Sequence, residues 1–200
     1  MNASIQITAL VRQQAVIPYA DFPHMLKAHL DKNKNTQAIE LSGYALRTCN
    51  TMRWADIEVF VKKVCAWGGY SGISGRVLKR NSSAEIAKNV NAAISKLSSS
   101  PPDLVGALKA MMEIKGLGLS FASKHMRFLF PEYCPVLDSV LSNRLLFELS
   151  PDGYKLFSTA CKDISHELNG ANIICPFPGK SSWRPSDVEA ALYAWANEWV

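Results

Sequence analysis

Residues 111–144 read MMEIKGLGLSFASKHMRFLFPEYCPVLDSVLSNR and carry the most informative pattern in the sequence. At its centre, residues 114–120 read IKGLGLS and lie between two segments with the apolar spacing of helices. Gly116 and Gly118 flank one apolar residue, and because glycine adopts positive φ at little cost, this spacing predicts a very tight turn. Such a turn exposes backbone N–H groups and the N-terminus of the next helix, where a phosphate can bind. A plain corner between two helices is the alternative for this turn taken alone.

Polar residues follow the turn at helical spacing. Ser120, Lys124 and Arg127 fall at i, i+4 and i+7, which predicts one polar face on the second helix. The face begins where the phosphate would lie, so we expect phosphate contacts from these side chains and from Lys115 in the turn. The opposite, buried side is predicted to carry Phe121, Ala122, Phe128 and Leu129.

A carboxylate lies beyond this helix. Residues 135–138 read PVLD and place Asp138 just before a predicted helix over residues 139–149. An aspartate in this position caps a helix by accepting hydrogen bonds from its first backbone N–H groups. A capping role and a chemical role are compatible for Asp138.

The combination of an h-x-G-h-G turn and a Pro-x-h-Asp segment resembles the helix–hairpin–helix DNA glycosylase superfamily. In this family, the catalytic aspartate lies about 18 residues after the position that is two residues beyond the second hairpin glycine. Here that position is Ser120, and Asp138 follows it by 18 residues. The sequence looks most like small bacterial proteins of the 8-oxoguanine glycosylase fold. The strong resemblance covers residues 111–148, and a weaker one extends through residues 67–69 and 183–193.

The resemblance implies an all-α, two-lobed helical bundle. It implies a single domain over residues 1–200, with the helix–hairpin–helix motif and the catalytic aspartate segment at about 104–148. The iron–sulfur cluster of some superfamily members needs four closely spaced cysteines near the C-terminus, and this sequence has no such group. We therefore expect no cofactor.

The activity implied is that of a monofunctional DNA glycosylase, which hydrolyses the bond between a base and its sugar and leaves an abasic site. Bond cleavage gives the sugar oxocarbenium character, so a carboxylate such as Asp138 stabilises the developing charge and orients or deprotonates the attacking water. Bifunctional relatives carry a lysine nucleophile where this chain has Ser120. The expected partner is double-stranded DNA with a damaged or modified base.

Three alternatives remain open from the sequence. Lys124 could contact phosphate, or it could be an amine nucleophile that forms a Schiff base and nicks the strand as a lyase. The chain could also be a DNA-binding module without catalysis, a reading that Ser120 permits. The base could be an oxidised purine such as 8-oxoguanine, or a hypermodified phage base such as glucosylated hydroxymethylcytosine excised in anti-phage defence.

A base inside a duplex must flip out and stack on aromatic side chains in a pocket. Two segments are predicted as loops that could supply such side chains, residues 67–76 and 169–185. The candidates for the base pocket are Trp67, Tyr70, Trp183 and Trp195, with Asp187 as a possible hydrogen-bonding partner. Packing in the core is the alternative for each of them.

Positive charge gathers in one part of the chain. The net charge of the protein is +5, and residues 61–90 alone account for +5, with six basic residues and one acid. Clustered positive charge favours a polyanionic partner. The expected DNA contacts in this region are Arg76, Lys79 and Arg80.

Helix signals dominate the remaining sequence, and strand signals are scarce. Residues 36–48 and a segment around Ile57 to Val64 have helical spacing. Capping boxes are predicted at Ser82 to Glu85 and at Ser186 to Glu189, where the second would open the C-terminal helix. Further helix starts are predicted at Asp21, Thr51 and Asp103.

Composition excludes several classes of protein. The 200 residues are 48% hydrophobic and 20% charged, which is typical of a globular domain and excludes disorder and collagen. No apolar run approaches the roughly 20 residues of a membrane helix, and the N-terminal sequence lacks the pattern of a secretory signal. Five scattered cysteines argue against a disulfide framework, and neither cysteine nor histidine spacing supports a metal site. We expect a cytoplasmic monomer that does not bind membranes.

Overall fold

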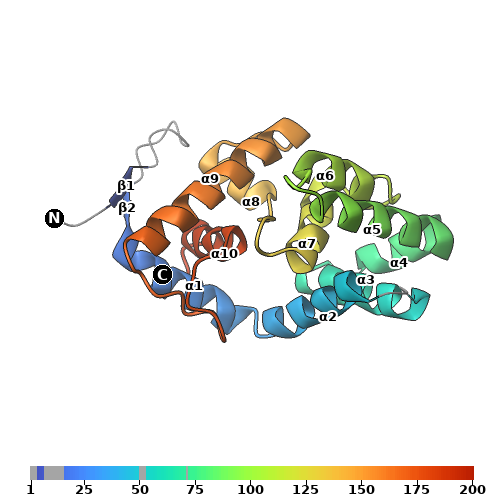
Figure 1. Cartoon of the computed structure of the whole chain (residues 1–200), viewed down its shortest axis with the longest axis horizontal. Coiled ribbons are helices and arrows are strands. Elements are labelled where there is room, and N and C mark those ends of the chain that lie inside the picture. The colour runs from blue at the N-terminus through green and yellow to red at the C-terminus, as the bar shows by residue number, and fades with distance from the viewer. Residues whose placement is uncertain (1–3, 7–15, 50–52, 71) are drawn as a thin grey trace.

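The computed structural model describes residues 4–6, 16–49, 53–70 and 72–200, and within them the chain forms ten α-helices and one small sheet (Figure 1). The predicted all-α class is therefore confirmed. The helices are α1 (Phe22–Lys32), α2 (Thr36–Thr48), α3 (Trp54–Trp67), α4 (Gly72–Arg80), α5 (Ser83–Leu97), α6 (Leu104–Met112), α7 (Leu119–Leu129), α8 (Ser139–Leu145), α9 (Pro151–Gly170) and α10 (Pro185–Ala196).

The small sheet is a feature that the sequence analysis did not predict. Strand β1 (Ser4–Gln6) pairs antiparallel with β2 (Val16–Pro18), with Ile5 opposite Ile17. The 3-10 helix η2 (Tyr19–Asp21) follows β2 and leads directly into α1. Within the described residues, no helix combines the length and apolar character needed to cross a bilayer.

Helix α7 lies in the middle of the molecule. Figure 1 shows α1, α9 and α10 toward one end and α4, α5 and α6 toward the other, with α7 between them. Helix α1 packs along α10, α5 along α6, and α2 along α7. As a result, the side chains from Phe121 to Leu129 are all buried.

The burial of α7 contradicts the prediction of an exposed polar face on this helix. A helix buried on every side is normally apolar all round. Here the buried residues include Ser123, Lys124, His125 and Arg127. A buried polar group is costly unless it has a partner, so these side chains require polar partners inside the protein.

Most predicted helix starts are confirmed, but one is wrong. Ser82 and Glu85 form the expected capping box of α5, and Asp103 caps α6 through the backbone N–H of Gly106. The box predicted at Ser186 to Glu189 does not form, because the N-cap of α10 is Arg184, two residues before Ser186. Ser186 and Glu189 lie buried inside α10 instead.

The remaining two predicted starts have different outcomes. Asp21 occupies the N-cap position of α1, with proline in the first turn, although its side chain makes no capping hydrogen bond. Thr51 lies outside the described residues, and α3 begins at Trp54.

Three further boundaries differ from the expectations. The glycine-rich segment 67–76 is not a loop throughout, because α4 begins at Gly72. Helix α8 ends at Leu145 rather than at residue 149, since Leu146 adopts the left-handed conformation with φ of 58°. The 20-residue helix α9 was not predicted, although Ser150 as the cap and Pro151 in the first turn are ordinary start signals.

Helices α2 and α7 approach each other at a glycine. A Cβ atom added at Gly43 would overlap the backbone carbonyl of Phe128, so only glycine allows this separation between the two helices. The contact fixes the position of α7 against α2.

We predict that Gly43→Ala lowers the free energy of unfolding by about 1–3 kcal/mol, as overpacking of a close contact does. The matched control is Gly75→Ala on α4, where an added Cβ meets nothing within 4 Å. That variant is expected to gain about 0.5–1 kcal/mol from the better helix propensity of alanine. Urea denaturation measures both changes, and equal stability of the two variants would show that α2 and α7 do not approach so closely.

Candidate functional site

The segment between α6 and α7 forms the tight turn that the glycine spacing predicts. Gly116 has φ of +104°, a conformation that other residues rarely adopt. The side chain of Asn81 holds the turn in place, because its Oδ1 accepts from the Lys115 backbone N–H at 2.9 Å and its Nδ2 donates to the Lys115 carbonyl at 2.9 Å. Gly118 is the N-cap of α7 and has no side chain to cap the helix. The N-terminus of α7 is thus available to an external acceptor.

The basic segment of the chain borders this turn. A Cβ atom added at Gly116 would lie 3.7 Å from Cδ of Arg76, so α4 and the turn are in contact. Arg76, Lys79, Arg80 and Lys115 are all exposed. Lys115 forms a long ion pair with Glu85, 3.8 Å between Nζ and Oε1. Arg76 of the basic segment therefore lies beside the turn, and the exposed Lys79 and Arg80 lie on the same helix.

Asp138 is fixed by three hydrogen bonds. Its Oδ1 accepts from the backbone N–H groups of Val140 at 3.1 Å and Leu141 at 3.3 Å, which confirms the predicted N-cap of α8. Its Oδ2 accepts from Nζ of Lys124 at 3.1 Å. Asp138 is only 8% exposed. Its position and orientation are therefore determined by both α7 and α8.

The chain before Asp138 is tied to the neighbouring helices. Ser123 on α7 accepts a hydrogen bond from the Leu137 backbone N–H at 3.2 Å. Tyr154 on α9 donates from its hydroxyl to the Pro135 carbonyl at 3.2 Å. These contacts hold the segment that presents the carboxylate rigidly against α7 and α9.

Lys124 lies in the interior, 6% exposed, and not on a DNA-facing surface. Its Nζ donates to Oδ2 of Asp138 and to Oγ of Ser120, the latter at 3.0 Å, and it lies 5.3 Å from the centroid of the Phe121 ring. The predicted phosphate contact of Lys124 is wrong, because the ammonium group is already bound inside the protein. The pairing instead brings an amine and a carboxylate together.

The predicted DNA contact of Arg127 is also wrong, since its side chain is 0% exposed. Its guanidinium lies 3.4 Å from Glu40 on α2 and 3.6 Å from Glu189 on α10. Glu40 in turn binds Arg184, 2.9 Å away, just before α10. Arg127 therefore links α2, α7 and α10 and has no access to phosphate.

A small cavity of about 90 Å³ lies beside the Lys124–Asp138 pair. Burial, aided by the charge of Arg127, lowers the pKa of His29 on its wall to about 3, so this histidine is neutral at physiological pH. Nδ1 of His29 is buried and has no hydrogen-bond partner among the described residues. The lining residues are His29, Asn33, Trp67, Gly68, Lys124, Val136, Asp138, Glu189, Tyr193 and Trp199.

Trp199 forms part of the wall of this cavity. Its ring centroid lies 5.4 Å from that of Tyr193 and 6.1 Å from that of His29. The ammonium of Lys32 lies 4.7 Å from the Trp199 ring, as in a cation–π contact. The indole is thus held by residues of both α1 and α10.

Only one of the predicted pocket aromatics lines this cavity. Trp67 does so, and its Nε1 donates to the Thr36 hydroxyl at 3.1 Å. Tyr70 is 69% exposed on the surface near Phe121. Trp195 lies against Arg144, whose guanidinium is 4.9 Å from its ring, and borders a different cavity.

The two other predicted pocket residues lie elsewhere. Asp187 is fully buried and binds Arg184 with both carboxylate oxygens, so it is not accessible to a base. Trp183 is buried against Phe22, and its indole N–H donates to the Ile173 carbonyl at 2.9 Å. The predictions that Trp183, Trp195 and Asp187 share a pocket with Asp138 are therefore wrong.

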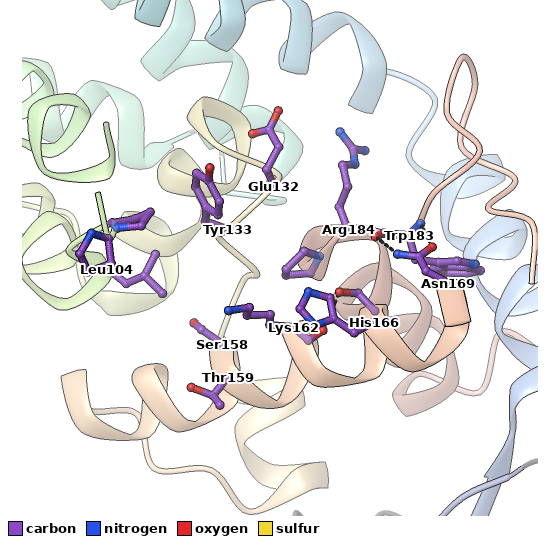
Figure 2. Close-up of a pocket in the computed structure, with 14 residues that line it drawn as sticks. Leu104, Glu132, Tyr133, Ser158, Thr159, Lys162, His166, Asn169, Trp183 and Arg184 are labelled. Atoms are coloured by element: carbon purple, nitrogen blue, oxygen red, sulfur yellow. Dashed lines mark hydrogen bonds between the residues drawn. The ribbon is translucent and has the colours of Figure 1, made fainter. Parts of the chain in front are cut away.

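Trp183 borders a second and larger cavity, of about 510 Å³ (Figure 2). Figure 2 shows Lys162 and His166 on α9, across from Glu132, and the hydrogen bonds between Asn169 and the Trp183 backbone. This cavity lacks the Lys124–Asp138 pair. We assign the candidate site to the smaller cavity, because there the buried ionisable groups converge.

Sequence reasoning missed five residues that line the candidate site, namely His29, Asn33, Glu189, Tyr193 and Trp199. They belong to α1, α10 and the segments after them, far in sequence from Asp138. A signal existed for Glu189, which interrupts the apolar run of Val188, Ala190 and Ala191 and so is a charged residue on a helix that is otherwise suited to burial. The other four carry no local pattern.

The described residues contain no group of three or more His, Cys, Asp or Glu side chains placed to hold a metal ion. Comparison of the chain with known protein families, with curated proteins and with solved structures finds no match.

We predict that Lys124→Met lowers the free energy of unfolding by about 3–5 kcal/mol, because it leaves Asp138 buried without its cation. Lys88→Met, at an exposed position of α5, serves as the control and should change stability by less than about 0.5 kcal/mol. Removing both charges, in Lys124→Met with Asp138→Asn, should recover part of the loss. Urea denaturation measures all of these, and a strictly additive double variant would contradict the ion pair.

Proposed function

We propose that this protein is a monofunctional DNA glycosylase that hydrolyses the bond between a flipped-out damaged or modified base and its sugar. The observation that carries the proposal is the buried Lys124–Asp138 pair, which faces a small polar cavity directly beyond a glycine turn. An ionised carboxylate held in a fixed position suits the stabilisation of an oxocarbenium-like sugar.

We interpret α6, the glycine turn and α7 as a helix–hairpin–helix unit that binds the DNA backbone. The positive φ of Gly116 and the uncapped N-terminus of α7 support this, because free backbone N–H groups at a helix start bind phosphate. The exposed cations of α4 extend the same surface. The helices on either side of α7 would then be two lobes with the cavity between them.

The size of the cavity sets a condition on base binding. Pockets for small molecules measure about 300 Å³ or more, whereas this cavity measures about 90 Å³. A base therefore enters only if a wall moves. Trp199 lies beyond the end of α10 and is the wall residue that we expect to move. Trp67 is held by its hydrogen bond to Thr36 and would stay as a stacking surface.

In the proposed reaction, Asp138 faces the sugar and the attacking water. Lys124 and the two N–H groups of α8 hold the carboxylate in one orientation by hydrogen bonds to both of its oxygens. The negative charge stabilises the positive sugar, and a free lone pair orients the water or takes its proton. Ser120 has no amine with which to form a Schiff base. This residue is therefore consistent with hydrolysis rather than covalent catalysis.

The contact between Lys124 and Asp138 also favours a second candidate, a glycosylase with lyase activity. The Lys124 amine lies 3.1 Å from the carboxylate, inside the site and not on the surface. If it attacked the sugar, borohydride would trap a covalent protein–DNA adduct that Lys124→Met could not form. Absence of the adduct in an active protein would leave hydrolysis as the mechanism.

Two classes of base remain candidates for the substrate. One is an oxidised purine such as 8-oxoguanine, as in DNA repair. The other is a hypermodified phage base such as glucosylated hydroxymethylcytosine, removed as a defence against phage. That the protein acts in the cytoplasm as a monomer stays a prediction.

We predict that Asp138→Asn abolishes base release and keeps DNA binding. Asparagine still caps α8 but carries no charge to stabilise the sugar. The measurement is cleavage of the incubated duplex by hot alkali, which breaks the strand only at abasic sites, alongside a binding assay. Duplexes with 8-oxoguanine and with glucosylated hydroxymethylcytosine serve as substrates.

The control for this experiment is Asp163→Asn, an exposed acid on α9. It should be as active as the unaltered protein. Full activity of Asp138→Asn would contradict the assigned role of the aspartate. Binding of every duplex without any alkali-labile site would support the non-catalytic DNA-binding module instead.

We also predict that Arg76→Ala and Lys115→Ala each weaken DNA binding in a salt-dependent way. Each lost phosphate contact should reduce the slope of log K against log salt by about 0.9. Lys155→Ala on α9, exposed but away from the turn, is the matched control and should leave the slope unchanged. Unchanged slopes for Arg76 and Lys115 would place the DNA on another surface.

A further inference from the structure

The cavity contains a second carboxyl group, that of Glu189 on α10. Glu189 is 1% exposed and lines the cavity together with Asp138. Its Oε2 is buried and accepts no hydrogen bond among the described residues. The nearest cation is Arg127, with Nε 3.6 Å from Oε2, beyond hydrogen-bond distance. Glu189 is thus a buried polar group without a full partner, and the unsatisfied oxygen calls for an explanation.

Charge balance in the interior points to a proton on Glu189. Within the described residues, the Lys124–Asp138 pair and a separate network around Arg127 and Arg184 together contain three cations. They contain four carboxyl groups, namely Asp138 in the pair and Glu40, Asp187 and Glu189 in the network. Three of these carboxyls have a cation within hydrogen-bond distance, and Glu189 does not. The network is neutral when Glu189 alone is protonated.

The pKa of Glu189 agrees with this balance. Burial raises the pKa of Glu189 to about 7, with the charge of Asp138 acting in the same direction. The charges of Arg127 and Lys124 and a hydrogen bond from the Val136 backbone to the carboxyl oppose this shift. Glu189 is therefore protonated in part of the molecules near neutral pH. The titratable groups that face Glu189 from the neighbouring elements are His29 of α1, Lys124 and Arg127 of α7, Asp138 before α8, Cys161 of α9 and Tyr193 of α10.

The uncharged members of this set do not compete for the role of acid. Burial lowers the pKa of His29, so it holds no second proton to donate at neutral pH. Burial also raises the pKa of Cys161 and that of Tyr193, which makes both of them weaker acids than usual. Among the described lining groups, Glu189 is the one that both holds and releases a proton near pH 7.

We infer that Glu189 is a second catalytic residue, the acid that protonates the leaving base while Asp138 remains ionised opposite it. The inference rests on the proposed glycosylase function and adds a step to it. Two carboxyl groups whose surroundings favour opposite protonation states are the usual arrangement for acid and base in hydrolysis of glycosidic bonds.

Protons and electrons are conserved in the proposed step. Glu189 transfers its proton to a ring nitrogen or oxygen of the base as the bond between the base and C1′ breaks, and the bonding electron pair leaves with the base. Water adds its oxygen to C1′ and gives its proton to the Asp138 carboxylate. The products are a neutral free base and an abasic site, and solvent returns the proton from Asp138 to Glu189.

The test is the pH dependence of base release in a single turnover, from about pH 5.5 to 8.5, on the 8-oxoguanine and glucosylated hydroxymethylcytosine duplexes. The unaltered protein should lose rate by about tenfold per pH unit above pH 7, as Glu189 ionises. Glu189→Gln should be at least about 100-fold slower at pH 6 and should lack this falling limb. Glu189→Asp, which restores a carboxyl group, should keep the limb and recover part of the rate.

The matched control is Glu58→Gln, an acid at the surface of α3 that pairs with Lys62. It should keep both the rate and the limb. If the role of Glu189 were purely structural, Glu189→Gln would change the rate equally at every pH and would keep the fall in rate above pH 7. That result would overturn the inference. The inference is also overturned if the rate of base release by the unaltered protein does not fall above pH 7. This result does not depend on whether any variant folds.

Failure of the inference and failure of the proposed function give different results. If the unaltered protein releases no base from either duplex at any pH, the function proposed for these substrates fails, and the role of Glu189 fails with it. If it releases base but Glu189→Gln does so equally well, the glycosylase proposal stands and only the assignment of the acid is wrong.

Discussion

Helix α7 has no exposed side from Phe121 to Leu129, yet it carries two cations, and the rest of the structure depends on their neutralisation. Buried charges are tolerated only when they are paired. Lys124 therefore requires Asp138, which brings the start of α8 against α7, and Arg127 requires Glu40, which brings α2 against α7. Arg127 also lies 3.6 Å from Glu189 of α10. The same pairing that permits burial assembles a carboxylate, an amine and a small cavity at one place.

The local parts of the fold and site could be predicted because the residues that determine them are close in sequence. The turn follows from Gly116 and Gly118, the capping box of α5 from Ser82 and Glu85, and the N-cap of α8 from Asp138. The errors arise where partners are distant. Periodicity places Lys124 and Arg127 on a polar face, but it does not reveal that this face meets acids from α2, α8 and α10.

The cavity illustrates the same limit. Its walls join α1, α3, α7 and α10, so the set of His29, Trp67, Asp138 and Glu189 exists only once α1 has packed along α10. The sequence identified aromatic residues of the right type, and the fold placed Trp183 against Phe22 and Trp195 against Arg144 instead. Composition also identified the basic segment, but the contact of Arg76 with the turn at Gly116 required the structure.

We propose that the cavity beside the Lys124–Asp138 pair is a glycosylase active site. The most direct measurement is mass spectrometry of the small molecules released when the protein is incubated with a panel of DNAs, including oxidised DNA and phage DNA with hypermodified bases. The account predicts that one free modified base accumulates in step with abasic sites in the same DNA. Tight binding of all the DNAs with no free base released from any of them would contradict it.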